Sequence, residues 1–237
     1  MKTFNTGIMS LDSQLNGGFR AGSVVLVLED PGAGGEVFTY HFALEGVKKG
    51  ERVLYVCTED TSEEIVNGMM NLMGVPEEIA RKIEFVDIIG QRLRIGCDES
   101  DPKSFIRSMR YDPLNGLKSL VEKEKYDRVI INSLSYFVMN YEERDVIALV
   151  ETFSLQSKMN ESIFFVLLTK GMFNPQFETT IKHFADGVIE LTLKEVENEV
   201  QRRFKILKLK NAFVPKAVLR YDIAQKGIRM ESVMRVL

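Results

Sequence analysis

The chain has 237 residues, 45% of them apolar, and a formal net charge of -3. This length is enough to bury one sizeable core, so we expect a single domain over residues 1–237. The mildly acidic balance argues against a global basic field for nucleic acid or an anionic membrane. The N-terminal stretch M-K-T-F-N-T-G lacks the apolar core of a signal peptide, and the apolar runs suit buried strands. We therefore expect a cytoplasmic protein without membrane insertion.

Short apolar, β-branched runs alternate with longer segments of helical period, which predicts an α/β fold with a mostly parallel sheet flanked by helices. The predicted strands are Ser23–Leu28, Arg52–Cys57, Ile83–Asp87, Arg128–Asn132 and Ile163–Leu168. The predicted helices are Glu36–Lys49, Ser62–Met73, Pro102–Lys125, Glu142–Met159 and Gln176–Phe184. Thr61 followed by Ser62, Glu63 and Glu64 is a typical helix start, with a capping oxygen and acids in the first turn.

The pattern changes to period two after Asp186 and Gly187, in V-I-E-L-T-L-K-E, R-R-F-K-I-L-K-L-K and V-L-R-Y-D-I. These runs predict antiparallel strands that extend the sheet at its C-terminal edge. The segment from Gly90 to Tyr111 mixes charged residues with Gly and Pro, and we expect a loop or insertion there.

The cysteines and histidines do not indicate a disulfide or a metal site. Cys57 ends the apolar run V-L-Y-V-C, where a buried free thiol is expected in place of a disulfide with Cys97. His41 and His183 lack Cys or His neighbours at ligand spacing, so no bound metal is predicted.

The octapeptide E-D-P-G-A-G-G-E, from Glu29 to Glu36, follows a predicted strand and precedes a predicted helix. That is the context of a phosphate-binding loop, in which backbone N–H groups form an anion nest at a helix N-terminus. In the pattern G-x-x-x-x-G-K-[ST], Glu29 stands at the first Gly, Gly35 at the Lys and Glu36 at the hydroxyl residue. Only Gly34 retains its residue type.

The surrounding sequence resembles the KaiC-like and RadA-like branch of the RecA superfamily. T-G-I-M-S-L-D-S-Q-L-N-G-G-F-R-A-G-S, from Thr6, matches the spacing of the family's entry segment. Further similar stretches are L-Y-V-C-T-E-D-T-S-E-E-I, Y-D-R-V-I-I-N-S, F-F-V-L-L-T and the C-terminal A-D-G-V-I-E-L and I-L-K-L-K-N. The resemblance covers most of the chain outside 90–120 and implies a RecA-like P-loop ATPase fold.

The resemblance also implies roles for particular positions. Glu59 and Asp60 match the acidic pair that polarises the attacking water. Asn132 stands where the Walker B acid supports Mg²⁺, and an amide coordinates that ion more weakly. Thr169 matches a sensor of the γ-phosphate. Lys208 and Lys210 match hairpin cations that reach a neighbouring subunit's nucleotide. The implied nucleotide-binding positions are Asp30, Gly32, Ala33, Gly34, Gly35, Glu36, Asn132 and Thr169.

The interaction free energies at these positions predict a nucleotide site of low affinity. Losing the charge-assisted bond from Lys to phosphate costs about 1.5–3 kcal/mol. An anionic Glu36 about 4 Å from a phosphate adds about 4 kcal/mol at an effective dielectric of about 20. The sum predicts an affinity loss of about a thousandfold or more. We expect no tightly bound cofactor, weak binding of ATP or ADP with Mg²⁺, and a Glu36 carboxylate that replaces the phosphate at the helix start.

The function predicted from sequence is thus a non-hydrolysing KaiC-like protein that serves as regulator, scaffold or partner subunit. One alternative is an ATPase completed in trans by Lys208 or Lys210 of a neighbour. Another is a single-stranded-DNA-binding protein like the RadA paralogues, but the candidate loop 171–180 has two Phe and no Lys or Arg. The partner is an unidentified protein, and any homo-oligomer is expected to be loose and salt-sensitive.

Overall fold

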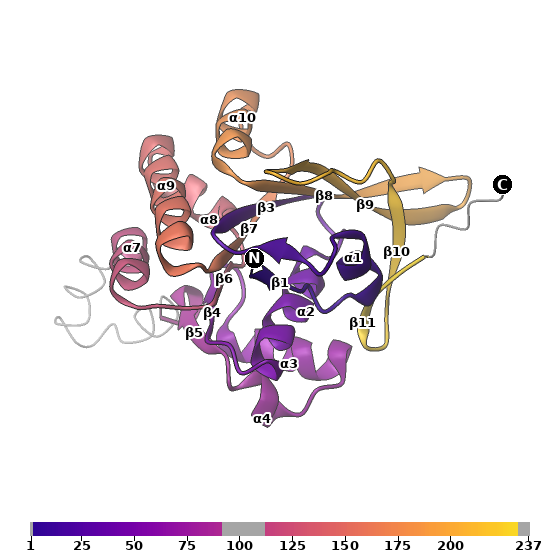
Figure 1. The fold of residues 1–237 in the computed structure, drawn as a ribbon, viewed down its shortest axis with the longest axis horizontal. Coiled ribbons are helices and arrows are strands. Elements are labelled where there is room, and N and C mark those ends of the chain that lie inside the picture. The colour runs from indigo at the N-terminus through magenta and orange to yellow at the C-terminus, as the bar shows by residue number, and fades with distance from the viewer. Residues whose placement is uncertain (1, 92–111, 232–237) are drawn as a thin grey trace, which may run out of the picture.

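The computed structural model describes residues 2–91 and 112–231. Within them, a nine-stranded sheet runs in the order β11-β10-β9-β8-β3-β7-β6-β4-β5 (Figure 1). Its strands are β3 (Ser23–Glu29), β4 (Val53–Cys57), β5 (Glu84–Asp87), β6 (Arg128–Ile131), β7 (Ile163–Thr169), β8 (Gly187–Val196), β9 (Glu199–Leu209), β10 (Leu219–Ala224) and β11 (Gly227–Met230). A separate pair joins β1 (Thr3–Phe4) to β2 (Phe19–Arg20).

The sheet is parallel from β5 to β8 and antiparallel from β8 to β11. The predicted mostly parallel sheet with a C-terminal antiparallel extension is therefore confirmed. Strand β8 joins the two parts, because it pairs in parallel with β3 and antiparallel with β9. All carboxyl ends of the parallel strands lie at one edge, where α/β folds place their ligand sites.

Helices cover both faces of the parallel part (Figure 1). They are α1 (Met9–Gln14), α2 (Gly35–Lys48), α3 (Ser62–Met73), α4 (Glu77–Ala80), α7 (Pro113–Lys123), α8 (Ser135–Asn140), α9 (Glu143–Asn160) and α10 (Pro175–Phe184). Two apolar clusters result, one between the sheet and α2 and α3, the other between the sheet and α7, α9 and α10. Strand β3 serves both, since Val25 and Val27 face α2 while Val24 and Leu26 face α9 and α10.

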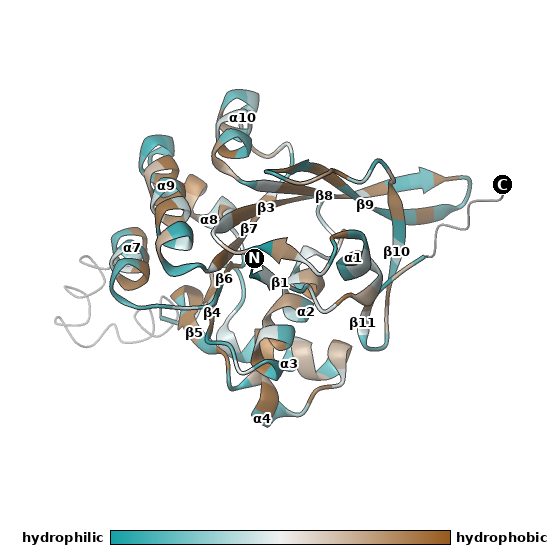
Figure 2. Cartoon of the chain, in the orientation of Figure 1, coloured by the Kyte–Doolittle hydropathy of each residue, from teal (hydrophilic) through white to brown (hydrophobic). Residues whose placement is uncertain are grey.

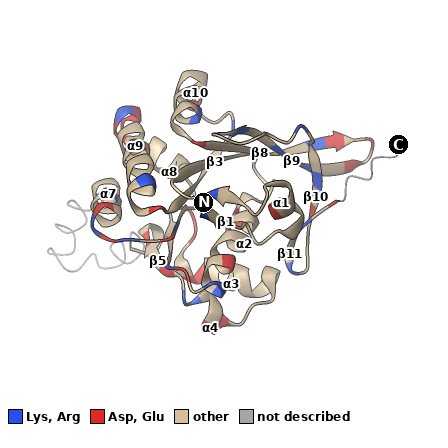
Figure 3. Ribbon diagram, in the orientation of Figure 1, with Lys and Arg blue, Asp and Glu red and all other residues tan. Residues whose placement is uncertain are grey.

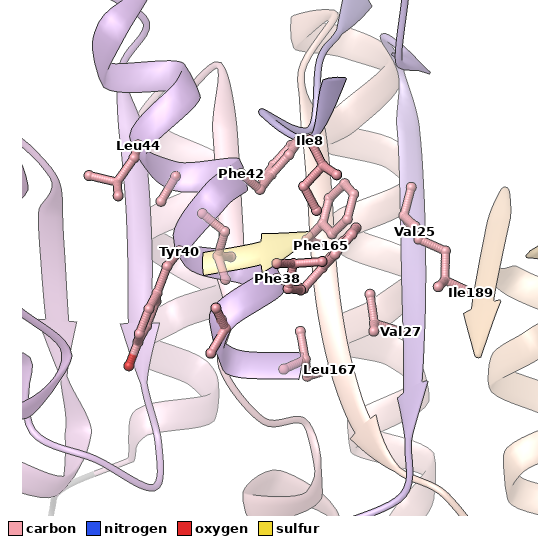
Figure 4. Close-up of a cluster of buried hydrophobic side chains, with 14 of the residues drawn as sticks. Ile8, Val25, Val27, Phe38, Tyr40, Phe42, Leu44, Phe165, Leu167 and Ile189 are labelled. Atoms are coloured by element: carbon pink, nitrogen blue, oxygen red, sulfur yellow. The ribbon is translucent and has the colours of Figure 1, made fainter. Parts of the chain in front are cut away.

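Aromatic packing fixes α2 against the sheet. The rings of Phe42 and Phe165 stack with centroids 4.0 Å apart, and Phe38 lies beside them (Figure 4). Figure 2 shows the same arrangement as brown central strands with more polar residues on the outer helices. The burial of β3 and β7 on both faces explains why their sequences are apolar throughout.

The N-terminal segment from Thr6 to Gly18 stabilises the packing of the first elements. The Asp12 carboxylate accepts hydrogen bonds from the backbone N–H of Thr6 at 2.6 Å and of Gly7 at 3.2 Å. Gly18 has φ 114°, and a Cβ there would lie 2.1 Å from the Phe4 carbonyl oxygen. The spacing T-G-x-x-x-L-D followed by G-G therefore locks the N-terminal strand pair and α1 against the core.

Most predicted elements are confirmed to within about a turn of their predicted ends, and α3 spans the predicted residues Ser62–Met73, with Thr61 and Glu64 forming a capping box. The helix predicted over Pro102–Lys125 is wrong at Asp112, which is not helical. The Asp112 carboxylate instead accepts from Asn115 N–H at 3.2 Å, and Pro113 begins α7. Residues 102–111 of that prediction lie outside the described residues.

Two other predictions need correction or a limit. The loop predicted from Gly90 to Tyr111 begins with helical residues at 88–91, and the Asp87 carboxylate accepts from Gly90 N–H at 2.7 Å there. The remainder, including Cys97, lies outside the described residues; Cys57 is fully buried in β4. Sequence analysis missed β1, β2, α1, α4 and α8, which are short. Among the described helices, none is both long and apolar enough to cross a membrane.

Candidate functional site

The turn from β3 into α2 has the glycine geometry of a phosphate-binding loop. Gly32 and Gly34 have φ of 86° and 91°, a region that side chains with a Cβ rarely adopt. Ala33 N–H donates to the Asp30 carbonyl at 2.9 Å, and Gly34 then caps α2. The loop therefore delivers the start of α2, with its free N–H groups, to the carboxyl edge of the sheet.

The carboxylate of Glu29 binds one of these N–H groups. Glu29 is the last residue of β3, and its Oε2 accepts from Gly35 N–H at 2.7 Å. A Cβ on Gly35 would lie 2.5 Å from the same oxygen, so the absence of a side chain at Gly35 makes room for Glu29. The sequence analysis assigned this self-liganding role to Glu36; the hydrogen bond instead comes from Glu29.

A cavity of about 370 Å³ opens above the loop. It is lined by Glu29, Pro31, Gly32, Gly34, Gly35, Glu36, Glu59, Asp60, Asn132, Leu167, Thr169 and Ile223. The lining contains four acidic residues and no Lys or Arg among the described residues. This distribution is the reverse of that expected for a polyphosphate site.

Burial and neighbouring charges raise the proton affinity of Glu29 and Glu36. The pKa of Glu29 rises from 4.5 to about 7, mainly through burial and further through the charges of Glu36, Glu59 and Asp30, against the lowering effect of the Gly35 N–H bond. Burial, followed by the charges of Asp60 and Glu59, also raises the pKa of Glu36. Glu29 and Glu36 thus hold protons more tightly than carboxylates in water.

Polar side chains fix Asn132 and Thr169 at the ends of β6 and β7. The Asn132 Oδ1 accepts from the hydroxyl of Tyr55 at 3.1 Å, and its Nδ2 donates to Asp60 Oδ2 at 3.4 Å. Thr169 N–H donates to Ser135 Oγ at 3.1 Å. The amide of Asn132 therefore directs its donor, not its oxygen, toward the acidic pair.

The C-terminal strand β10 lies against the loop. The Tyr221 hydroxyl donates to the Ala33 carbonyl at 2.7 Å, and Tyr221 is 1% exposed. A Cβ on Gly34 would lie 2.3 Å from Ile223 Cδ1, so the Ile223 side chain rests directly on the loop glycine. The loop is thereby held between β3 beneath it and β10 beside it.

The strand β8 holds the loop from its other side. Asp30 N–H donates to the Leu191 carbonyl at 2.9 Å, and the Asp30 carboxylate accepts from Leu193 N–H at 2.9 Å. Asp30 and the buried Ala33 therefore serve the loop's own structure and do not line the cavity.

Lys208 and Lys210 lie away from this cavity, near the start of β8. Lys208 Nζ donates to the carbonyls of Lys182 and His183 at 3.1 and 3.0 Å. Lys210 Nζ lies 3.2 Å from Asp186 Oδ1. Both cations are thus engaged within their own chain in this structure.

The loop considered for single-stranded DNA buries one of its two aromatic side chains and leaves the other, Phe173, partly exposed. Phe177 is 2% exposed in the core beneath α10. Phe173 packs edge-on to it, with ring centroids 5.9 Å apart. Both rings stabilise the attachment of α10.

The structure thus brings most of the residues that sequence analysis singled out into one cavity. They are Gly32, Gly34, Gly35, Glu36, Glu59, Asp60, Asn132 and Thr169. Sequence analysis missed Tyr55, Tyr221 and Ile223, which come from distant segments and carry no local signal. The acid at the first glycine position was the one signal that could have identified Glu29 as a ligand of the loop.

The strand order, the glycine loop between β3 and α2 and the polar residues at the carboxyl edge define a RecA-type P-loop fold. The family model "ATPase: KaiC" matches residues 4–233. The chain therefore belongs to the KaiC ATPase family.

Similar proteins occur in bacteria and archaea. A UPF0273 protein of Thermotoga maritima is 25% identical over 236 residues, covering 96% of this chain and 95% of its own. The circadian clock oscillator protein KaiC of Rippkaea orientalis is 24% identical over 98% of this chain, which spans 42% of that longer protein. The crystal structure of a KaiC-like protein from Pyrococcus horikoshii superposes with a TM-score of 0.76 at 20% identity, covering 98% of this chain and 99% of that one.

Proposed function

We propose that this KaiC-family chain does not hydrolyse ATP and acts as a regulator, scaffold or partner subunit. One observation carries the proposal: the Glu29 carboxylate accepts the Gly35 N–H bond at 2.7 Å, at the loop position where a phosphate would be bound. An intramolecular ligand is present at an effective concentration that a weakly bound nucleotide cannot match.

The charge of the cavity supports the same conclusion. Glu36, Glu59 and Asp60 line it together with Glu29, and the described lining offers no cation. Two unit charges about 4 Å apart interact by about 4 kcal/mol at an effective dielectric of about 20. A triphosphate entering here would meet repulsion of that order from each ionised carboxylate, without the Lys that normally offsets it.

The two positions that the resemblance assigns to magnesium binding, 36 and 132, carry other residues in this chain. Mg²⁺ requires oxygen ligands in near-octahedral geometry. At the Walker B position, the Asn132 Oδ1 accepts a hydrogen bond from the Tyr55 hydroxyl, and its Nδ2 donates to Asp60. Position 36 carries Glu in place of the hydroxyl residue. The proposed function therefore includes no hydrolytic step through a metal-bound nucleotide.

The structure gives no observation that favours the two alternatives. An ATPase completed in trans needs free cations, but Lys208 and Lys210 bind carbonyls and Asp186 of their own chain. Single-stranded-DNA binding needs exposed aromatics with nearby cations, but Phe177 is buried.

Phosphate release by the purified protein with ATP and Mg²⁺ tests the proposal. We expect no Mg-dependent hydrolysis above the background of the protein-free mixture. Glu59→Gln is the matched variant, because it removes the carboxylate best placed by resemblance to polarise water. Turnover of about one per minute or faster, abolished by Glu59→Gln, would refute the proposal.

A further inference from the structure

The antiparallel extension of the sheet carries a second feature, on the face opposite the apolar core. Leu191, Phe204 and Tyr221 point from β8, β9 and β10 into the core. Side chains alternate along each strand, so the residues between them point outward. The outward positions include Lys194 on β8, Arg203 and Lys205 on β9 and Arg220 on β10. We call these four residues the cationic face.

The strand register brings these cations together. Arg203 lies directly opposite Thr192 of β8 on one side and Arg220 of β10 on the other. Lys205 lies one row further along, opposite Glu190. Figure 3 shows the resulting blue along β9 and β10, where the sheet extends beyond α10.

The cationic face is accessible, and two acids, Glu190 of β8 and Asp222 of β10, share its outward side. Lys194, Lys205 and Arg220 are exposed, and Arg203 is partly exposed. None of the four belongs to a salt bridge between described residues. Glu190 already pairs with Lys170 at 2.8 Å, and Asp222 lies opposite another cation, Arg229 of β11.

Arg203 opposite Arg220 is an unfavourable arrangement in the free sheet. Like charges on directly opposed strand residues destabilise a sheet, because their Cβ atoms are only about 5 Å apart. An anion placed between the two guanidinium groups removes this repulsion. Arginine also presents a planar fork of N–H donors that matches a carboxylate in a bidentate geometry.

We propose that the cationic face binds an acidic segment of a partner protein, rich in Glu or Asp. The inference rests on the proposed function in that it supplies the partner through which a non-hydrolysing chain acts. Carboxylates complement the paired arginines in charge and in their bidentate geometry. The outward residues of β8, β9 and β10 on the described face include no aromatic side chain on which bases stack.

Fluorescence anisotropy with a fluorescein-labelled peptide of alternating Glu and Ser tests the proposal. The test variant is Arg203→Glu/Lys205→Glu/Arg220→Glu. The matched control is Lys82→Glu/Lys123→Glu/Lys125→Glu, which changes three exposed lysines elsewhere and shifts net charge by the same amount. Oligothymidylate of the same net charge as the peptide is the competing probe. Circular dichroism verifies that each variant is folded.

We expect the wild type and the control to bind the peptide and the test variant to bind it at least about tenfold more weakly. Binding should decline at about 0.5 M NaCl, where exposed charges are screened. Equal binding by the test variant and the control overturns the proposal, as does the absence of peptide binding by the wild type. Tighter binding of oligothymidylate than of the peptide assigns the face to nucleic acid and also overturns it.

Light scattering measures the oligomeric state and so tests whether a second copy of this chain, in place of an acidic partner, occupies the cationic face. An oligomer of the wild type that dissociates in the test variant but not in the control would assign the cationic face to a second copy of this chain. ATP hydrolysis by the wild type would refute the proposed function without affecting the peptide result. The two inferences therefore fail by different measurements.

Discussion

We predict that tight ATP binding by this chain requires the removal of Glu29 in addition to the exchange of the two residues that follow Gly34. From sequence alone, Gly35→Lys/Glu36→Thr is expected to suffice. In the structure, a Cβ at position 35 would lie 2.5 Å from Glu29 Oε2. The new Lys would displace the carboxylate or pair with it, and either outcome competes with phosphate. We therefore predict that only Glu29→Gly/Gly35→Lys/Glu36→Thr binds ATP well.

The magnitude follows from the contacts at the loop. A charge-assisted bond from Lys to phosphate contributes about 1.5–3 kcal/mol. Removing a carboxylate about 4 Å from a phosphate contributes about 4 kcal/mol when it is fully charged. Burial raises the pKa of Glu29 to about 7, so only part of this charge is present at neutral pH. Half of the carboxylate contribution is about 2 kcal/mol, which corresponds to a Kd about thirtyfold lower for the triple than for the double variant. Together with the Lys bond it gives about 3.5–5 kcal/mol, or a Kd at least about three hundredfold lower for the triple variant than for the wild type.

Calorimetric titration with ATP and Mg²⁺ measures this difference on the wild type, the double variant and the triple variant. The double variant is the matched control, since it differs from the triple variant at Glu29 alone. Equal affinities of the double and triple variants would refute the assignment of Glu29 as the loop's own ligand. A folded triple variant that binds no better than the wild type would show that the loop backbone does not accept phosphate.

Four further predictions concern stability, each measured by urea denaturation. Between pH 4.5 and about 7 the folded state retains the Glu29 proton that the unfolded state has lost, so the free energy of unfolding of the wild type falls as pH rises. Because Gln does not titrate, the stability of Glu29→Gln relative to the wild type should increase by about 2–3 kcal/mol from about pH 4 to pH 8. Parallel pH profiles of the two proteins would contradict this. Tyr221→Phe should cost about 0.5–1.5 kcal/mol through loss of the 2.7 Å bond to the Ala33 carbonyl; an unchanged midpoint would argue against that bond. Phe42→Ala should cost about 3–5 kcal/mol because Phe42 is fully buried on Phe165, whereas Phe213→Ala, at a fully exposed residue, should stay within about 0.5 kcal/mol. Thr61→Ala should cost about 1 kcal/mol through loss of the capping box, whereas Asn67→Ala, at an exposed position inside the same helix, should not destabilise the protein.

The parallel sheet and its flanking helices could be predicted because their signals are local. Ser23 to Glu29 and Ile163 to Thr169 are apolar throughout, as strands buried on both faces must be. The short elements were not predicted because their stabilising contacts are not local. The six residues of α1 are stabilised by Asp12 bonding back to Thr6 and Gly7, a tertiary lock that no helical period reveals.

The sequence by itself determined which residues stand at the phosphate loop, including the acid at its first position and the missing Lys and hydroxyl group. It did not determine which carboxylate would turn onto the loop. That choice depends on space: Gly35 leaves room for Glu29. Tyr221 and Ile223 reach the loop because β10 pairs with β9 in the sheet, and local sequence does not encode this non-local pairing. The arginines of the cationic face are distant in sequence and adjacent only through the same strand register.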